Sequence, residues 1–130
     1  MQRSVPVLFA ILLLACGSPP PAPFRFPPSA GAWTLKQASD LPLSGALEQA
    51  RRLGLTRAQV GEYEGPGRLE AEVYEMTSDA AALEMEQTWK PAADTVAFHQ
   101  GAYFTIVRWQ NADRAAVSAF VREMEKRVGR

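Results

Sequence analysis

Carboxylates are the side chains of this chain that could most readily do chemistry. Eight of them lie between Glu62 and Glu86, where Arg68 is the single basic residue. Paired carboxylates can act as the acid and base of a hydrolase, or bind calcium. Glu70 and Glu72, however, fall on the polar side of an alternating segment, where acids are expected on any half-buried strand. No Asp-x-Asp-x-Asp-Gly loop occurs. We therefore predict no metal site and keep a hydrolase with carboxylate chemistry as one alternative.

Nucleophilic catalysis has little support in the sequence. A nucleophilic Ser, Thr or Cys needs a neighbouring base, and the chain has one histidine, His99, next to a predicted turn. There is no Gly-x-Ser-x-Gly or Ser-x-x-Lys pattern. The loop at residues 65–67 is short and flanked by acids, so it should repel phosphate rather than bind it. We predict that the protein is not an enzyme and has no catalytic residues and no cofactor.

The single cysteine, Cys16, has a distinctive setting. Arg3 supplies a positive charge, residues 5–15 are almost entirely apolar, and the run ends in Leu13-Leu14-Ala15-Cys16. A membrane-spanning helix needs about 20 apolar residues, roughly twice what this run offers. Charge, apolar run and small residue in that order are typical of a secretory signal. An ordinary cleaved signal peptide is the alternative.

This arrangement resembles the lipobox of bacterial lipoproteins. The resemblance implies that residues 1–15 are a signal peptide, cut off before Cys16, and that the Cys16 thiol carries a diacylglycerol. It also implies a lipid anchor, palmitate included, in the cell envelope. Gly17 stands where an Asp would act as the retention signal. We therefore expect the outer membrane, facing the periplasm, if the host is Gram-negative.

Charge is balanced overall but unevenly distributed. Lys and Arg equal Asp and Glu in number, for a net charge of zero. Nothing therefore points to nucleic acid as a partner. The acidic stretch in the middle contrasts with a mostly basic tail at residues 122–130, a segregation typical of solvated faces that complement each other or a partner. The expected partners are the membrane, through the N-terminal lipid, and a protein partner or a second copy in a homodimer.

The chain divides into a tether and one domain. Prolines dominate residues 18–28, and proline fixes φ and removes hydrogen-bond donors, so we predict a Pro-rich tether of about 30 Å over residues 16–30. Phe24 and Phe26 interrupt the prolines and could dock onto the domain. Residues 31–130 form a single predicted α+β domain.

The predicted elements alternate as α-β-β-α-β-β-α. Helical spacing, strand alternation and turn residues place them at residues 46–53, 58–64, 69–76, 79–89, 95–99, 102–109 and after Asp113. Ser78 and Asp113 are the expected N-caps, and Gly54 the expected helix stop. In the last helix an apolar stripe recurs at Val117, Phe120, Val121, Met124 and Val128. We predict a four-stranded antiparallel sheet with helices mainly on one face.

A second resemblance is slight. Tyr63-Glu64-Gly65, Val73-Tyr74-Glu75-Met76 and Ser78-Asp79-Ala80-Ala81 resemble a pattern in some uncharacterised bacterial exported domains. It implies no function.

The strand predicted at residues 102–109 is apolar on both faces, with Phe104 and Ile106 on one and Tyr103, Val107 and Trp109 on the other. Helices on one side of the sheet cover only one of these faces. The second cover could be the helix at 46–53, the segment at 24–33 or another subunit. Alternatively, Tyr103 and Trp109 lie half-exposed at a sheet edge.

Together these observations favour a membrane-anchored exported lipoprotein that is a non-enzymatic binding or accessory module. Tyr103, Trp109 and Trp89 are its candidate binding residues. A carrier of a small apolar ligand is a further alternative, with a pocket lined by Trp89, Phe98, Phe104 and Trp109.

Overall fold

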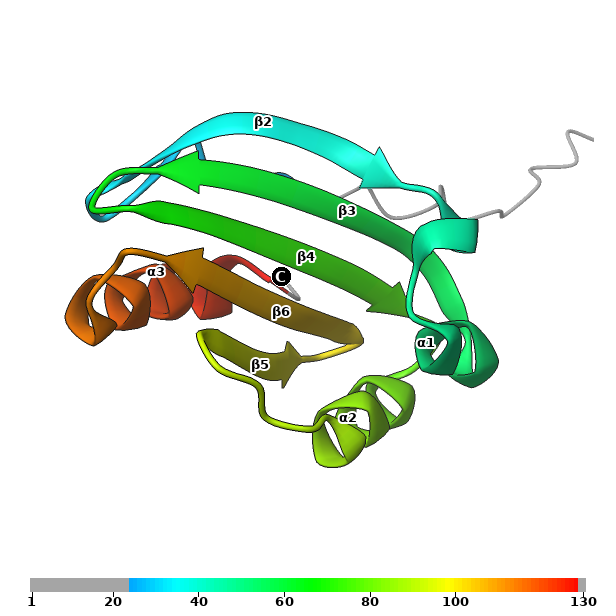
Figure 1. The fold of residues 1–130 in the computed structure, drawn as a ribbon. Helices are drawn as coiled ribbons and strands as arrows, with labels where there is room; N and C mark the ends of the chain where they lie inside the picture. The colour runs from blue at the N-terminus through cyan, green and yellow to red at the C-terminus, as the bar shows by residue number, and fades with distance from the viewer. Residues whose placement is uncertain (1–23, 129–130) are drawn as a thin grey trace, which may run out of the picture.

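The computed structural model describes residues 24–128, which form one antiparallel sheet of six strands with three α-helices (Figure 1). The strands are β1 (Ser29–Ala30), β2 (Trp33–Leu41), β3 (Leu55–Glu64), β4 (Arg68–Met76), β5 (Thr95–Gln100) and β6 (Tyr103–Gln110). The helices are α1 (Glu48–Leu53), α2 (Asp79–Thr88) and α3 (Arg114–Arg127), with a 3₁₀ turn at Leu43–Gly45. In this part of the chain, no helix combines the length and the apolar character that crossing a bilayer requires.

The sheet runs in the order β1-β2-β3-β4-β6-β5, with every neighbour antiparallel. The predicted α+β class and antiparallel sheet are confirmed, but the predicted count of four strands is wrong. The additional strands are β1 and β2, which extend the sheet beyond β3. Residues 36–40 of β2 are exposed on both sides of the strand, so the sequence there has no apolar alternation from which a strand could be predicted.

The local signals for the helix ends are confirmed. The Ser78 hydroxyl accepts a hydrogen bond from the backbone N–H of Ala81 at 3.1 Å and begins α2. The Asp113 carboxylate accepts one from Ala116 at 2.8 Å and begins α3. Gly54 ends α1 with a φ of 104°, which is the left-handed region that glycine reaches without steric cost.

Helices cover both faces of the sheet, so the expectation of helices mainly on one face is wrong. In Figure 1, α3 lies behind the sheet, whereas α1 and α2 gather at one end of its front. Phe104 and Ile106 are fully buried in a cluster with α1 and α2. Val107 is fully buried in a second cluster, with Phe120 of α3. Both covers of β6 therefore come from the chain itself.

Three predicted stripe residues of α3, Val117, Phe120 and Met124, are buried against the sheet, and Val121 is half-buried. Val128, directly after the helix, is also buried. α3 therefore buries the side of the helix that its periodicity predicts. The periodicity could not specify which face of the sheet the helix covers.

Part of the predicted tether packs on the domain. The Phe26 side chain is buried, and the Tyr63 hydroxyl donates a hydrogen bond to the Pro27 carbonyl oxygen at 2.8 Å. Phe26 lies against Gly61, where a Cβ atom would come within 2.6 Å of the ring. The glycine is therefore required for this close approach. Packing begins ahead of residue 31, the predicted start of the domain.

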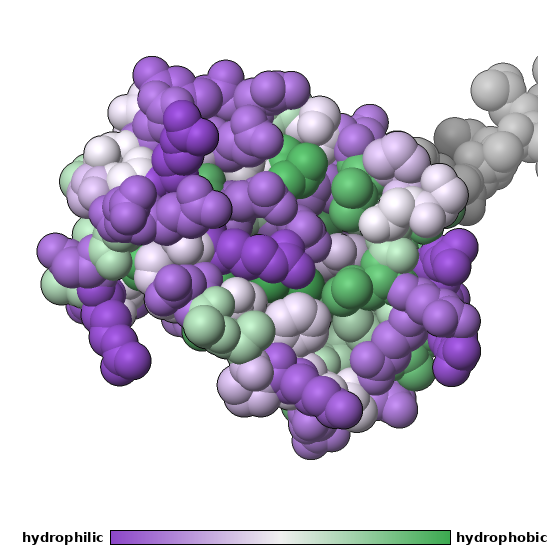
Figure 2. All heavy atoms as spheres, viewed as in Figure 1, coloured by the Kyte–Doolittle hydropathy of each residue, from purple (hydrophilic) through white to green (hydrophobic). Residues whose placement is uncertain are grey.

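The front of the sheet is only partly covered. α1 and α2 occupy one end, and the other end of β3, β4 and β6 is open in Figure 1. Figure 2 shows this open area as mostly hydrophilic, with hydrophobic residues gathered toward the α1 end. The exposed faces of the domain, rather than its core, therefore hold the candidate sites.

Candidate functional site

The three predicted binding residues do not form one surface. Tyr103 and Trp109 both pack on the α3 side of the sheet, but at opposite ends of β6. Trp89 lies on the other side, with its ring centroid 6.0 Å from that of Phe104. Cys16 lies outside the described residues.

The apolar pocket predicted for a carrier is also divided. Phe98 and Trp109 belong to the cluster on the α3 side, whereas Trp89 and Phe104 belong to the cluster beneath α1 and α2. The sheet separates the two pairs. The prediction that these four residues line one pocket is therefore wrong, because alternate residues of β6 point to opposite faces.

Trp109 instead lines a groove between β5 and α3, which we call the edge groove. Its volume is about 790 Å³. Val96, Trp109, Val117 and Val121 supply apolar side chains, and Arg114 and Arg122 lie along its α3 side. The sequence analysis named Trp109 as a candidate binding residue but did not predict this groove, and it placed Val96, Val117 and Val121 only in a strand and a helix stripe.

The groove lies beside an unpaired strand edge. Within residues 24–128, β5 has a strand neighbour on one side only, because the sheet ends there. The Asp94 carbonyl oxygen accepts a hydrogen bond from the Trp109 N–H at 3.1 Å. Since antiparallel bonding alternates along a strand, residues 94, 96 and 98 bond to β6. The backbone groups of Thr95, Ala97 and His99 therefore point outward from the sheet.

The opposite edge of the sheet is blocked in several ways. β1 pairs with the start of β2 through Ala30 and Trp33. The pairing of β2 with β3 is irregular between Leu35 and Gln37, and Lys36 places an exposed charge there. Bulges, charges and short outer strands are devices that prevent edge pairing. β5 carries neither Lys, Glu, Asp nor Pro in its six residues.

A second surface feature, which we call the charged hollow, lies on the open front of the sheet. Its volume is about 630 Å³. Its charged lining residues are Lys36, Glu62, Glu64, Arg68, Glu70, Asp94 and Arg108. It meets the edge groove at Ala93, Asp94, Thr95 and Trp109, which line both.

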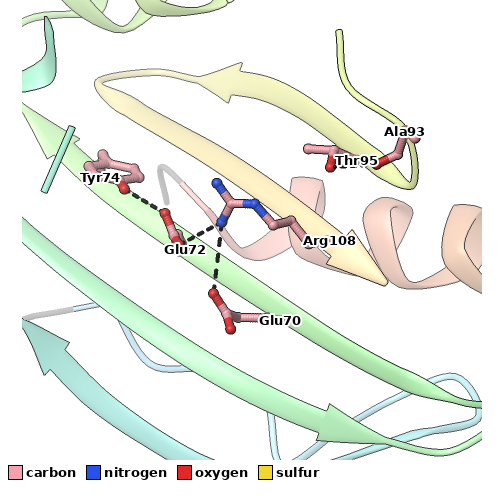
Figure 3. Close-up of polar contacts among 6 residues, drawn as sticks. All are labelled: Glu70, Glu72, Tyr74, Ala93, Thr95 and Arg108. Carbon is pink, nitrogen blue, oxygen red and sulfur yellow. Dashed lines mark hydrogen bonds and ion pairs between the residues drawn. The ribbon is translucent and has the colours of Figure 1, made fainter. Parts of the chain in front are cut away.

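An ion-pair network reaches the charged hollow through Glu70 and Arg108, which both line it (Figure 3). Arg108 of β6 points across to β4, where its Nη1 lies 2.6 Å from Glu72 Oε1 and 3.8 Å from Glu70 Oε1. The Tyr74 hydroxyl donates to Glu72 Oε2 at 2.5 Å. Glu72 therefore has both carboxylate oxygens bonded, and its side chain is only 14% exposed.

Burial and neighbouring groups shift the pKa values of Glu70 and Tyr74 in this network. Burial, followed by a hydrogen bond to Glu72 and its charge, raises the pKa of Glu70, and Arg108 opposes this only in part. Burial also raises the pKa of Tyr74, and Glu72 raises it further. A carboxyl whose pKa is raised, next to a second carboxyl, is the kind of pair that acid–base catalysis uses.

His99 has one carboxylate partner, because its Nδ1 contacts Glu86 of α2. The sequence had placed this histidine beside a turn, and it does lie near the end of β5. Among the described residues, no group of three or more His, Cys, Asp or Glu side chains is arranged to hold a metal ion.

Comparisons with known proteins found no family model, no curated protein and no solved structure that matches this chain. Its function must therefore be argued from its own residues.

Proposed function

We propose that this chain is an exported lipoprotein, anchored through Cys16, and that it acts as a non-enzymatic binding module. Its ligand is an extended segment of a partner protein, which adds to the sheet along the outer edge of β5. The observation that carries this proposal is that, among residues 24–128, no strand pairs with the outer edge of β5, which lies beside the edge groove.

Strand addition would use both the outer edge of β5 and the edge groove beside it. The outward backbone groups of Thr95, Ala97 and His99 offer hydrogen bonds to any extended chain, whatever its sequence. Side chains of an added strand alternate between the two faces of the sheet. Those on the α3 side would enter the edge groove against Trp109 and Val121, which favours apolar residues at every second position.

A proline at position 97 tests this proposal. Ala97→Pro removes an outward N–H and leaves the bonds between β5 and β6 intact, because Ala97 does not bond to β6. The matched control is Ala97→Ser, which also changes the side chain but keeps the N–H. Thermal unfolding of both variants checks that the fold is retained.

The readout is photo-crosslinking in cells, with p-benzoylphenylalanine in place of Ala92, an exposed residue of the edge groove. We expect a defined crosslinked product that Ala97→Pro abolishes and Ala97→Ser retains. The same label at Gln37, on the opposite edge, should give no such product. A product at twice the mass of the chain would identify a second copy as the partner. A product that survives Ala97→Pro contradicts strand addition.

The anchor has its own test. Cys16→Ser should abolish the incorporation of labelled palmitate, because the thiol is the proposed attachment atom. Two or more acyl chains hold a protein stably on a membrane, whereas one does not. Unchanged labelling of the Cys16→Ser protein would refute the lipid anchor.

A hydrolase with carboxylate chemistry is the second candidate, and the raised pKa of Glu70 beside Glu72 favours it. Glu70 would act as the general acid and Glu72 as the base or nucleophile. Turnover of a chromogenic glycoside or ester that falls at least about 100-fold in Glu70→Gln and persists in Glu64→Gln would support it. Equal turnover by the unmodified protein, Glu70→Gln and Glu64→Gln would exclude Glu70 and Glu72 as the catalytic pair.

A further inference from the structure

The packed part of the chain enters the domain on the α3 side of the sheet. Phe24, the first described residue, lies with its ring centroid 5.1 Å from that of Phe26 and 6.5 Å from that of Tyr103. Phe26 packs on Tyr63, whose ring lies 4.8 Å from that of Phe120 in α3. Phe24, where the described chain begins, therefore lies on the side of the sheet that α3 covers.

The chain between Cys16 and Phe24 limits how far the domain can lie from a membrane. At about 3.5 Å per residue, it cannot extend beyond about 28 Å even when fully stretched. A short tether of this kind gives the adjoining surface a high effective concentration at the bilayer. Weak attractions between that surface and the headgroups are therefore sufficient to orient the domain.

The surface nearest this attachment point carries an excess of positive charge. Exposed basic residues of α3 and of the segment before β1 are Arg25, Arg114, Arg122, Lys126 and Arg127. The acids of α3 are Glu123, which already pairs with Lys126 and Arg127, and Glu125. The buried stripe of α3 faces the sheet, so its charged residues face outward.

The opposite side of the sheet has the reverse character. The acids on this side outnumber the basic residues. The acids are Glu48, Glu62, Glu64, Glu70, Glu72, Asp79, Glu84 and Glu86, and the basic residues on or beside the same elements are Lys36, Arg51, Arg52, Arg68, Lys90 and Arg108. An anionic surface would therefore repel this side and attract the α3 side. The charge distribution and the position of Phe24 both favour an orientation with the α3 side toward the membrane.

We propose that the outer face of α3 rests on anionic lipid headgroups. This inference rests on the proposed lipid anchor at Cys16. The orientation directs the charged hollow away from the membrane and leaves the β5 edge at the side of the domain, open to a partner. Each Lys or Arg near an anionic surface strengthens the attraction roughly fivefold, and added salt weakens it.

The test uses the lipidated protein in vesicles, with one new cysteine for a fluorophore, since lipid occupies Cys16. Ser118→Cys labels an exposed position of α3 where the helix borders the edge groove, and Gln49→Cys labels α1. In vesicles with about a third phosphatidylglycerol and a headgroup-linked quencher, we expect strong quenching at position 118 and weak quenching at 49. Quenching at 118 should fall in 0.5 M salt and in phosphatidylcholine vesicles.

Charge reversal supplies the matched variants. Arg122→Glu with Lys126→Glu should remove most of the excess quenching at position 118. The ratio of molecules with α3 toward the membrane to molecules with α3 away from it should fall at least about 20-fold. Arg51→Glu with Arg52→Glu changes the net charge equally on α1 and should leave the quenching unchanged. Equal loss in both double variants would overturn the inference, because net charge rather than the α3 face would then be responsible.

The anchor and the orientation fail in different ways. Flotation with phosphatidylcholine vesicles reports the anchor alone, and a protein that does not float overturns both proposals. A protein that floats, but shows equal quenching at positions 118 and 49 in anionic vesicles, overturns the orientation and leaves the anchor in place.

Discussion

Phe120→Ala should be among the most destabilising single substitutions in this domain. The Phe120 side chain is fully buried, and its ring lies 4.8 Å from that of Tyr63 with the planes at 70°, an edge-to-face contact. α3 cannot readily collapse into the space that is left. Val117 and Met124 hold the helix on either side, and the Trp33 indole N–H donates to the Ala116 carbonyl oxygen at 3.1 Å.

The expected loss follows from these contacts. A buried Phe→Ala change costs about 3–5 kcal/mol in transfer and cavity terms, and the edge-to-face pair with Tyr63 places Phe120 toward the upper end. A domain of this size has about 5–15 kcal/mol of stability in total. Phe120→Ala should therefore lower the free energy of unfolding by a third or more, or prevent folding.

Urea denaturation followed by tryptophan fluorescence measures this loss, since Trp33 is buried in the same cluster. Leu83→Ala is the control, because Leu83 of α2 is 40% exposed and should lose less than about 1 kcal/mol. A loss below about 1 kcal/mol for Phe120→Ala would refute the packing of α3 on the sheet.

Three further variants test other parts of the structure. Glu70→Gln should raise the melting temperature at pH 7 and lose that advantage as the pH falls toward 4.5, the ordinary pKa of a Glu carboxyl. The reason is that a raised folded-state pKa favours the protonated carboxyl, so wild-type Glu70 loses its contribution to stability as the pH rises through that pKa. A stability advantage of Glu70→Gln that grows toward low pH would contradict this sign. Gly61→Ala should cost about 1–3 kcal/mol in urea denaturation, because its Cβ would meet the Phe26 ring at 2.6 Å; a neutral result would mean that Phe26 does not pack there. Asp113→Ala should cost about 1 kcal/mol through loss of the N-cap of α3, whereas Asp113→Asn should cost little.

Local chemistry was readable from the sequence where one residue decides the outcome. Ser78 and Asp113 each begin a helix, and Gly54 ends one, because a side-chain acceptor or a left-handed φ is needed at those positions. The α3 stripe was likewise predictable from its spacing. β2 was not, because residues 36–40 contact solvent on both faces and carry no pattern.

Long-range arrangement was less accessible. The two apolar faces of β6 required two covers, but nothing in the periodicity of α2 or α3 indicates which face each helix takes. Trp109 was identified as a candidate binding residue, yet the free edge beside it was not. A hairpin pattern does not reveal whether β5 or β6 lies next to β4, and that choice alone makes β5 the outer strand.

Amide hydrogen exchange on the crosslinked complex tests the central proposal most directly. The amides of Thr95, Ala97 and His99 point outward in the free protein and should exchange rapidly there. In the complex we predict that all three become protected, while the exchange of the β2 amides at residues 37–40, which pair with β3 on the far side of the sheet, does not change. Equal exchange at these three amides in the free protein and the complex would contradict strand addition at β5.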